Sequence, residues 1–119
     1  MRAEARRKRA SCVRALVQPG KAYVKISGAY RASNKSPDYA DVTPFAKALI
    51  AANADRIVWG MDWPHPDSAR IAGRKPDQVT PFLQIDDGRL MNHLSVWAPD
   101  AATRNKILVE NPARLYGFR

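Results

Sequence analysis

Three polar side chains that could do chemistry follow two short apolar segments of the sequence. Asp62 lies two residues beyond Gly60, where the apolar run of residues 57–59 ends. Arg31 follows the apolar run of residues 22–27 in a similar way, and His65 stands between two prolines in the turn after Asp62. A carboxylate can act as a general base, and a guanidinium can clamp an anionic group with paired hydrogen bonds. Asp62 is therefore the candidate catalytic residue, and Arg31 and His65 are candidate substrate-binding residues.

These residues also have a purely structural interpretation. An aspartate after a strand commonly caps the next turn or pairs with an arginine, and the pattern alone favours this role for Asp62. A single loop histidine such as His65 is commonly a hydrogen-bonding surface group, and His93 is expected on the exposed side of a helix. Ser27 and Cys12 have no neighbouring base in the sequence that would activate them as nucleophiles. The chain contains no Gly-rich phosphate loop, paired-cysteine zinc motif or HExxH helix.

The composition is that of an ordinary globular domain. The chain has 119 residues, of which 45% are hydrophobic and 26% charged, so it can form one modest core. No apolar run is long enough to span a membrane, and the N-terminus lacks the apolar core of a secretory signal. A single cysteine excludes an internal disulfide. We expect a cytoplasmic protein with no membrane partner.

The positive charge is concentrated at the N-terminus. The formal net charge is +9, but residues 1–14 hold six basic residues and one acidic residue. More than half of the excess therefore lies in a short segment, and a spread basic face typical of nucleic-acid binding is not indicated. The pattern predicts a basic extension over 1–14 and a folded part over 15–119. It also leaves an alternative function, a small basic module that binds nucleic acid or an acidic partner without catalysis.

The order of predicted elements is that of a βαβ unit. A strand over 22–27 is followed by a polar loop over 29–42 and by a helix for which Thr43 is the predicted N-cap. Asn53 can end that helix, and the run of residues 57–59 is the second strand. Strands joined through a helix are normally parallel neighbours, so the residues that follow both strands should lie at one edge of the sheet.

The second half of the sequence favours helices. Residues 68–87 are irregular and polar, and apolar residues at helical spacing predict a helix over 90–97. Asp100 can cap a further helix to about residue 109, which Pro112 should end. The apolar side chains of residues 115–118 are expected to dock against the rest of the protein.

Two strands alone do not make a stable sheet. The chain is therefore expected to be part of a larger assembly, formed by self-association or by a complementing chain. Apolar surface would be exposed where further strands should pair.

Three motifs together resemble a known family. The segment "RIVWGMDWPHP", preceded by "KISGAYR" and followed by "NPARLYGF", resembles the C-terminal part of amidohydrolase-type hydrolases. The similarity is closest to the branch that contains 2-pyrone-4,6-dicarboxylate hydrolase. The resemblance implies an α/β fold in which residues 15–119 supply the last two parallel strands and the flanking helices of a (β/α)8 TIM barrel.

The resemblance also implies a reaction. Asp62 matches an aspartate that activates the hydrolytic water, as a metal ligand in metal-dependent members and as a base in the pyrone hydrolases. Arg31 matches an arginine that holds an anionic group of the substrate, while His65 matches the motif and is assigned mainly to loop shape. The implied reaction is attack of water on the carbonyl of a small carboxylated cyclic ester or a related acid.

The sequence departs from the family pattern in two respects. A complete barrel of this type needs about 250 residues, and the His-x-His of the family's first strand is absent, since the only histidines are His65 and His93. A catalytic zinc takes about three protein ligands, which Asp62 alone does not provide. We therefore expect no cofactor on this chain, a divalent metal such as zinc only in a complete barrel, and a truncated chain whose activity alone is left open.

Overall fold

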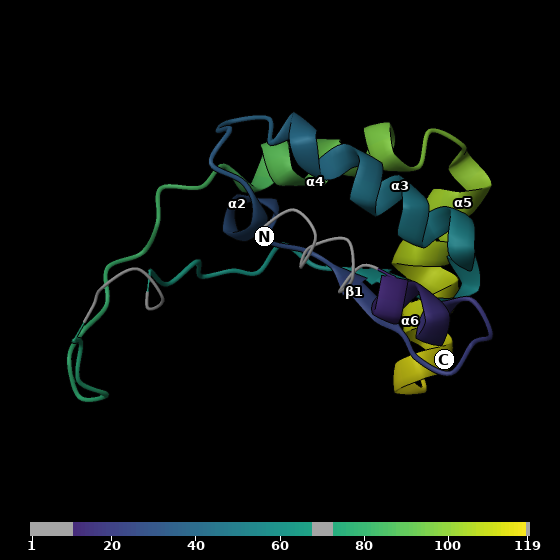
Figure 1. Ribbon diagram of the computed structural model, residues 1–119, viewed down its shortest axis with the longest axis horizontal. Helices are drawn as coiled ribbons and strands as arrows, with labels where there is room; N and C mark the ends of the chain where they lie inside the picture. The colour runs from purple at the N-terminus through teal and green to yellow at the C-terminus, as the bar shows by residue number, and fades with distance from the viewer. Residues whose placement is uncertain (1–10, 68–72, 119) are drawn as a thin grey trace.

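A parallel pair of short strands organises the first half of the protein. The computed structural model describes residues 11–67 and 73–118 of the chain. After a helical segment over 11–17, strand β1 (Val24–Ile26) pairs in parallel with strand β2 (Ile57–Trp59), with Val24 opposite Ile57 and Ile26 opposite Trp59. The connection contains α2 (Ala29–Ala32), η1 (Ala40–Val42), α3 (Thr43–Ala52) and η2 (Ala54–Arg56). Figure 1 shows this βαβ unit, which confirms the predicted order and strand direction.

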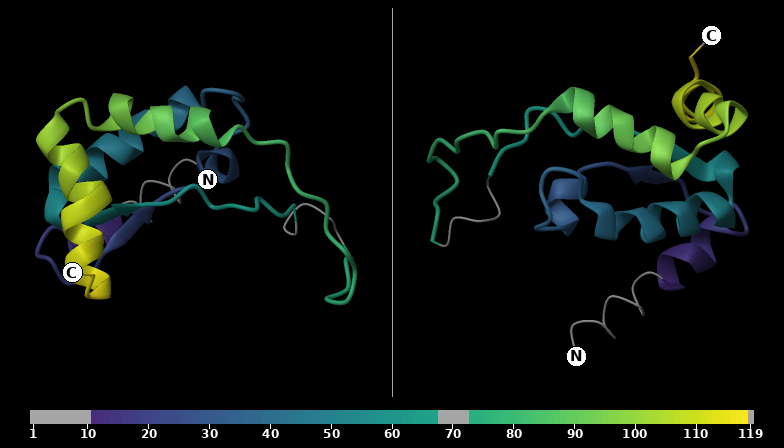
Figure 2. Two further views of the ribbon diagram at one scale, coloured as in Figure 1. Left: turned by 180° about the vertical axis from the view of Figure 1, so that it is seen from behind. Right: turned by 90° about the horizontal axis from the view of Figure 1, so that it is seen from above.

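The second half is a long loop followed by helices. After β2 the chain runs away from the helices and returns to α4 (Asp87–Trp97), which lies beside α3 (Figure 1). The helices α5 (Ala101–Asn105), η3 (Lys106–Glu110, a π-helical turn) and α6 (Asn111–Tyr116) then follow without a break. These last helices lie at the opposite end of the molecule from the long loop (Figure 2).

The core lies between the strand pair and the helices. Alternate residues of a strand face opposite sides of the sheet, so Val24 and Ile26 face the helices while the exposed Lys25 faces the other way. On the helices, the buried apolar residues recur at helical spacing, as predicted for α4. The core consists of Val17, Ile26, Ala29, Tyr30, Tyr39, Ala46, Ile57, Leu90, Leu94, Trp97, Ala98 and Ile107.

Two predicted helix boundaries are correct, and in both cases the side chain of the boundary residue caps the helical segment that follows it. Asp100 accepts hydrogen bonds from the backbone N–H groups of Ala102 and Thr103, which have no partner inside the helix. Asn53 ends α3, and its side chain accepts from the N–H of Asp55. Both residues act where the sequence pattern placed them.

The prediction of a polar loop over 29–42 is wrong in part. Residues 29–32 form α2, with Ala29 and Tyr30 buried, and residues 40–42 form the 3-10 turn η1. Gly28 precedes α2 with φ of 60°, a left-handed conformation that glycine adopts without a steric penalty. The glycine thus turns the chain directly from β1 into a helix, where the polar composition had indicated a loop.

Thr43 and Pro112 also differ from expectation. Thr43 is already helical, with no side-chain cap, because η1 runs straight into α3. Pro112 does not end the last helix, since it lies in the first turn of α6 directly after the π-helical turn. Because α6 continues directly from η3, Pro112 lies inside one helical run, and the π-helical turn before it interrupts the regular hydrogen-bond pattern at the residue that lacks an N–H group.

The C-terminal apolar side chains dock less than predicted. Leu115 is 38% exposed, Tyr116 59% and Phe118 66%. Tyr116 and Phe118 contact each other, with ring centroids 5.8 Å apart. In the described part of the chain, nothing covers these rings fully.

No helix of residues 11–67 and 73–118 is long and apolar enough to cross a membrane. Residues 1–10 of the predicted basic extension lie outside the described residues.

One buried amide joins the C-terminal helices to the strand pair. Asn111 is fully buried, and its Nδ2 donates to the carbonyl oxygens of Ala54 and Ile57 at 2.7 Å each. The carbonyl of Ile57 lies at the start of β2, and that of Ala54 lies in the turn η2 just before it. The amide therefore fixes α6 against the strand that leads to Asp62.

Replacement of Asn111 by alanine should destabilise the fold. The change removes one donor from each of two carbonyls, of which that of Ala54 still accepts from the N–H of Ile57, and loss of a buried hydrogen bond costs about 1–3 kcal/mol. We expect a drop of about 2 kcal/mol or more in the free energy of unfolding, measured with urea on the full chain. Asn105→Ala is the control, because Asn105 bonds only the exposed Glu110 side chain; equal losses in the two variants would contradict this role of Asn111.

Candidate functional site

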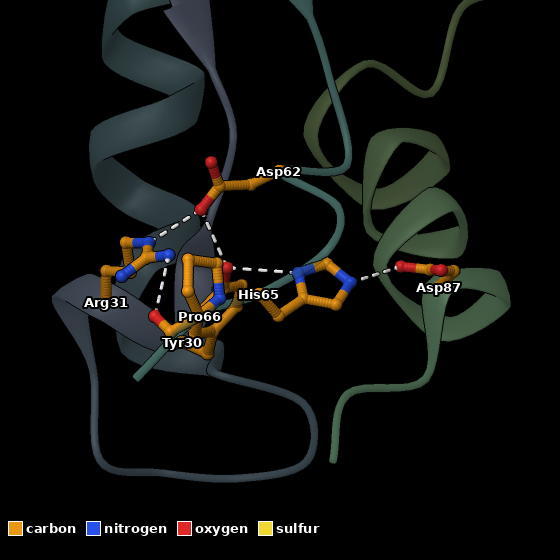
Figure 3. Close-up of polar contacts among 6 residues, drawn as sticks. All are labelled: Tyr30, Arg31, Asp62, His65, Pro66 and Asp87. Atoms are coloured by element: carbon orange, nitrogen blue, oxygen red, sulfur yellow. Dashed lines mark hydrogen bonds and ion pairs between the residues drawn. The ribbon is translucent and has the colours of Figure 1, made fainter. Parts of the chain in front are cut away.

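The two strands end at one edge, and their following residues meet there. The side chain of Arg31 donates from Nε to Oδ2 of Asp62 at 2.6 Å, and from Nη2 to the carbonyl oxygen of Pro66 at 3.4 Å (Figure 3). The side chains of Arg31 and Asp62 are 38% and 30% exposed, so a small molecule can reach both. The structure thus brings together two of the residues that the sequence singled out, as the parallel arrangement predicted.

Gly28 allows this close approach. A Cβ at this position would lie 3.2 Å from Oδ2 of Asp62 and 3.5 Å from Cδ of Arg31. A contact of 3.2 Å is tighter than ordinary van der Waals distance, and the left-handed φ disfavours a side chain in any case. A glycine is therefore needed at the point where the ion pair forms.

Tyr30 is a functional candidate that the sequence analysis missed. Its ring is 2% exposed, and its O–H group donates to Oδ2 of Asp62 at 2.6 Å. Burial, followed by the hydrogen bond to Asp62, raises the pKa of Tyr30 to about 12, so the phenol keeps its hydrogen at neutral pH. The adjacent Arg31 was selected for its charge, whereas the sequence pattern at Tyr30 is equally consistent with a core residue.

The two donors keep Asp62 ionised. The hydrogen bond from Tyr30, and next the one from Arg31, hold the pKa of the Asp62 carboxyl below its ordinary value. The same contact raises the pKa of Arg31. Within the described residues, all hydrogen bonds to the carboxylate go to Oδ2, and Figure 3 shows the other oxygen pointing away from Arg31 and Tyr30. One oxygen is thus held and the other is open.

The turn after β2 is unusual in its backbone. Asp62 and His65 have φ of 65° and 57°, left-handed values that are uncommon for residues other than glycine. The N–H of His65 donates to the carbonyl oxygen of Asp62 at 3.1 Å, and the N–H of Leu83 donates to that of His65 at 2.8 Å. The returning chain near residue 83 therefore holds the turn in a conformation that local preference alone would not select.

His65 is buried, contrary to the expectation of a surface group. It is 4% exposed; its Nδ1 lies 3.0 Å from the Tyr30 hydroxyl and its Nε2 lies 2.6 Å from Oδ1 of Asp87. Both ring nitrogens are thus engaged inside the protein. The loop of residues 66–86 returns the chain to this place, and an antiparallel bridge between Pro66 and Phe82 supports it.

Asp87 is the second residue that the sequence analysis missed. It is the first residue of α4, next to Asp86, whose side chain caps the helix by accepting from the N–H of Arg89. Two adjacent acids before a helix read as capping and dipole-compensating residues. The sequence held one indication of a further role for Asp87: a helix needs only one capping aspartate, and Asp86 already supplies it.

His93 was expected on the surface and is buried. It is 8% exposed, lies between Tyr39 and Trp97, and neither ring nitrogen has a hydrogen-bond partner among the described residues. The apolar positions of α4 determine which side faces the core, and His93 falls between two of them. Burial lowers the pKa of His93, with a smaller opposing effect from Asp38 and a reinforcing one from Arg89.

A metal ion does not fit the side chains that this chain offers. In the described residues, no three His, Cys, Asp or Glu side chains are placed to hold an ion together. Asp62 faces a guanidinium and a phenol, and both nitrogens of His65 are engaged. A catalytic metal needs about three protein ligands, which the described side chains do not bring together.

A cavity beside Tyr30 is lined by side chains other than Asp62 and Arg31. It has a volume of about 370 Å³ and is lined by Tyr30, Ser33, Asn34, Ser36, Tyr39, Leu83, Gln84 and Ile85. Neither Asp62 nor Arg31 lines it. The carboxylate therefore opens on the surface of this chain.

The strand pair and its flanking helices have a counterpart in a known family. A family model described as amidohydrolase matches residues 10–118, and the chain belongs to this family. Its two parallel strands and flanking helices form part of the family's TIM barrel, as the motifs had predicted.

Three curated relatives are similar over most of this chain. It is 44% identical over 95 residues to a 4-sulfomuconolactone hydrolase of Rhizobium radiobacter, covering 80% of this chain and 28% of that protein. It is 40% identical over 101 residues to a D-galactarolactone isomerase of Agrobacterium fabrum, covering 85% and 31%. It is 34% identical over 93 residues to a 2-pyrone-4,6-dicarboxylate hydrolase of Comamonas testosteroni, covering 78% and 27%. The chain thus spans about 30% of the length of these relatives.

A solved structure is similar as well. The apo crystal structure of an Agrobacterium tumefaciens protein matches with a TM-score of 0.68 and 36% identity, covering 92% of this chain and 35% of that one. The arrangement of elements described above is therefore the arrangement of one part of a larger known fold.

The buried His93 predicts a pH dependence of stability. Its pKa is lower in the folded state than in the unfolded state, so the unfolded chain takes up more protons as the pH falls. The free energy of unfolding should therefore decrease from pH 7.5 to pH 5, through the ordinary pKa of histidine at about 6.5. Urea unfolding at the two pH values measures this change.

His93→Phe is the matched variant. It keeps an aromatic ring and removes two unpartnered nitrogens, so it should not destabilise the fold at pH 7.5. Its decrease toward pH 5 should be smaller than that of the unchanged chain, because the variant lacks the buried imidazole whose pKa is lowered in the folded state. A decrease of the same size would show that His93 does not titrate as proposed.

Proposed function

We propose that this chain carries the hydrolytic carboxylate of an amidohydrolase-family enzyme that opens small carboxylated cyclic esters. The observation that supports this best is the carboxylate of Asp62, which has one oxygen held by Arg31 and Tyr30 at 2.6 Å each and the other open. Of the three relatives, two are named as hydrolases of lactone-type compounds and one as a lactone isomerase. A cyclic ester with acidic substituents is the substrate class that fits both facts.

In this proposal Asp62 acts as the general base. A water molecule hydrogen-bonded to Oδ1 gives a proton to the carboxylate while its oxygen forms a bond to the ester carbonyl carbon. The carbonyl then re-forms as the bond between that carbon and the ring oxygen breaks, and the ring oxygen takes the proton from Asp62 and leaves as a hydroxyl group, which restores the carboxylate. The negative charge that develops on the carbonyl oxygen is stabilised by a positive group nearby, for which Arg31 is available.

Arg31 connects substrate binding to the strength of the base. While it bonds Asp62, it lowers the pKa of that carboxyl and makes it a weaker base. A substrate carboxylate that takes over part of the guanidinium would weaken this bond and make Asp62 more basic. An anionic substrate would thus strengthen its own catalyst as it binds.

His65 remains part of the proposed site, but its main role in the proposal is to support Tyr30 and the turn of Asp62. A substrate contact was predicted for it, and that contact stays a prediction. Because the ring is 4% exposed and both nitrogens are engaged, its contribution here is to hold Tyr30 and the turn of Asp62. The alternative of a basic binding module depends on residues 1–14, and nothing in the described residues favours it.

Asp62→Asn tests the proposal. The amide cannot accept a proton from water, so turnover of a carboxylated lactone should fall at least 100-fold, as is typical for loss of a general base. The full chain is assayed with 4-sulfomuconolactone, D-galactarolactone and 2-pyrone-4,6-dicarboxylate by the change in ultraviolet absorption or by proton release. Circular dichroism of the variant checks that the fold persists.

Asp55→Asn is the matched control. Asp55 lies just before β2, at the other end of the same strand, and forms an exposed ion pair with Lys106 at 2.7 Å. The variant removes the same charge from a similar pair and should keep the turnover of the unchanged chain. Equal turnover in Asp62→Asn and Asp55→Asn would refute the role of Asp62.

The open surfaces of the chain support a further part of the proposal, that it self-associates or binds a complementing chain. In the described residues the sheet has two strands, and large apolar side chains such as Phe45, Val109 and Phe118 are 48–66% exposed. An open sheet edge and exposed apolar surface of this kind favour association with another chain. Analytical ultracentrifugation of the full chain should show a mass above that of the 13.3 kDa monomer that rises with concentration; a monomer at all concentrations would contradict self-association.

A further inference from the structure

A continuous line of hydrogen bonds leads from the surface of α4 to the candidate base. Asp87 contacts Nε2 of His65 at 2.6 Å, Nδ1 of His65 contacts the Tyr30 hydroxyl at 3.0 Å, and that hydroxyl contacts Asp62 at 2.6 Å (Figure 3). The four residues come from three separate parts of the chain. Figure 3 shows the His65 ring lying between Asp87 and Tyr30.

The middle of this line is buried and its ends are accessible. Tyr30 is 2% and His65 4% exposed, whereas the side chains of Asp62 and Asp87 are 30% and 38% exposed. Buried polar groups are costly unless they are bonded. Every polar side-chain atom in the buried section has a partner, so the line is a complete network.

The hydrogens of the network can be counted. Three contacts require three hydrogens, and the two carboxylates supply none when ionised. The Tyr30 hydroxyl has one hydrogen, which goes to Asp62, so its oxygen must accept from Nδ1 of His65. The contact with Asp87 then requires a hydrogen on Nε2, and the network is complete only when both ring nitrogens of His65 carry hydrogen.

This arrangement gives the Tyr30 hydroxyl one direction. With Nδ1–H of His65 occupying the phenol oxygen, the O–H group can point only at Asp62. If His65 instead presented a bare Nδ1, the phenol would donate to it, and Oδ2 of Asp62 would lose one of its two donors. The state of the imidazole therefore determines how firmly the carboxylate is held.

We propose that Asp87 is a positioning residue, which acts through His65 and Tyr30 to fix the carboxylate of Asp62 with its second oxygen free for water. The inference rests on the proposed function for the identity of the base, but the network itself can be tested without turnover. Asp87 holds the hydrogen on Nε2, His65 passes the orientation to Tyr30, and Tyr30 fixes Oδ2. A shift of the base by a fraction of an ångström is enough to lower the rate.

Nitrogen-15 NMR of the histidine rings in the full chain is the first test. At one fixed, near-neutral pH, both ring nitrogens of His65 should show the shifts of nitrogens that carry hydrogen. Asp87→Asn removes the negative charge that favours hydrogen on both ring nitrogens, so one ring nitrogen of His65 should move to the range of a bare nitrogen. Tyr30→Phe should keep the hydrogen on Nε2.

Asp86→Asn is the matched control. It removes the same charge one residue away, and asparagine caps a helix as well as aspartate does. The His65 pattern should be unchanged in this variant, and the resonances of His93 are recognised by their loss in His93→Phe. A single hydrogen on His65 in the unchanged chain, or a pattern that Asp87→Asn leaves unaltered, would overturn the proposal; if that variant does not fold, the hydrogen position in Tyr30→Phe decides.

Kinetics separates positioning from a merely structural role. Asp87→Asn should lower kcat about tenfold with little change in KM, since the substrate does not touch Asp87, and Asp87→Glu should recover part of the loss. A change in KM alone, or unchanged kinetics, would contradict positioning. Absence of turnover in the unchanged chain would contradict the proposed function, while the NMR pattern would still decide whether the network exists.

Discussion

The parallel pairing of β1 with β2 is the constraint on which the site depends. Ile26 lies opposite Trp59, so the segments after both strands leave the sheet at one edge. Arg31 and Tyr30 follow β1 by a few residues, and Asp62 follows β2 by three. A slip of one residue would turn each side chain of the moved strand to the other face. Burial of Ile26 and Ile57 against the helices prevents it, so the packing of the core fixes the position of the acid.

Around this edge the local conformations are ones that most residues avoid. Gly28, Asp62 and His65 all have left-handed φ values, and a non-glycine residue in such a conformation costs of order 1–3 kcal/mol when the surroundings impose it. Hydrogen bonds from distant parts of the chain hold these residues in place. The N–H of Leu83 bonds His65, and Tyr30 and Arg31 bond Asp62. The site is thus positioned by tertiary contacts rather than by the preferences of its own loop.

This explains which parts of the structure could be predicted from the sequence. The strand pair follows from consecutive apolar residues and a helix between them, and the meeting of Arg31 with Asp62 follows from parallel geometry. The contact of His65 with Asp87 joins residues that are 22 positions apart in the sequence, and no local pattern encodes such a contact. Pro112 continues a helix because a π-helical turn precedes it, which periodicity does not indicate. The prediction of an exposed His93 was wrong because the apolar residues beside it on α4 determine which side of the helix faces the core.

The residues that hold Asp62 differ for the most part from those that line the neighbouring cavity. The groups that set the charge and direction of Asp62 are all on this chain, and two of them are buried. The cavity beside the site shares only Tyr30 with the residues that hold the acid, since neither Asp62 nor Arg31 lines it. The relatives named as hydrolases and as an isomerase share this portion of the fold at 34–44% identity. A carboxylate that is tuned locally and enclosed by other residues can be kept while the enclosing loops change, which is how one barrel edge can serve different lactones.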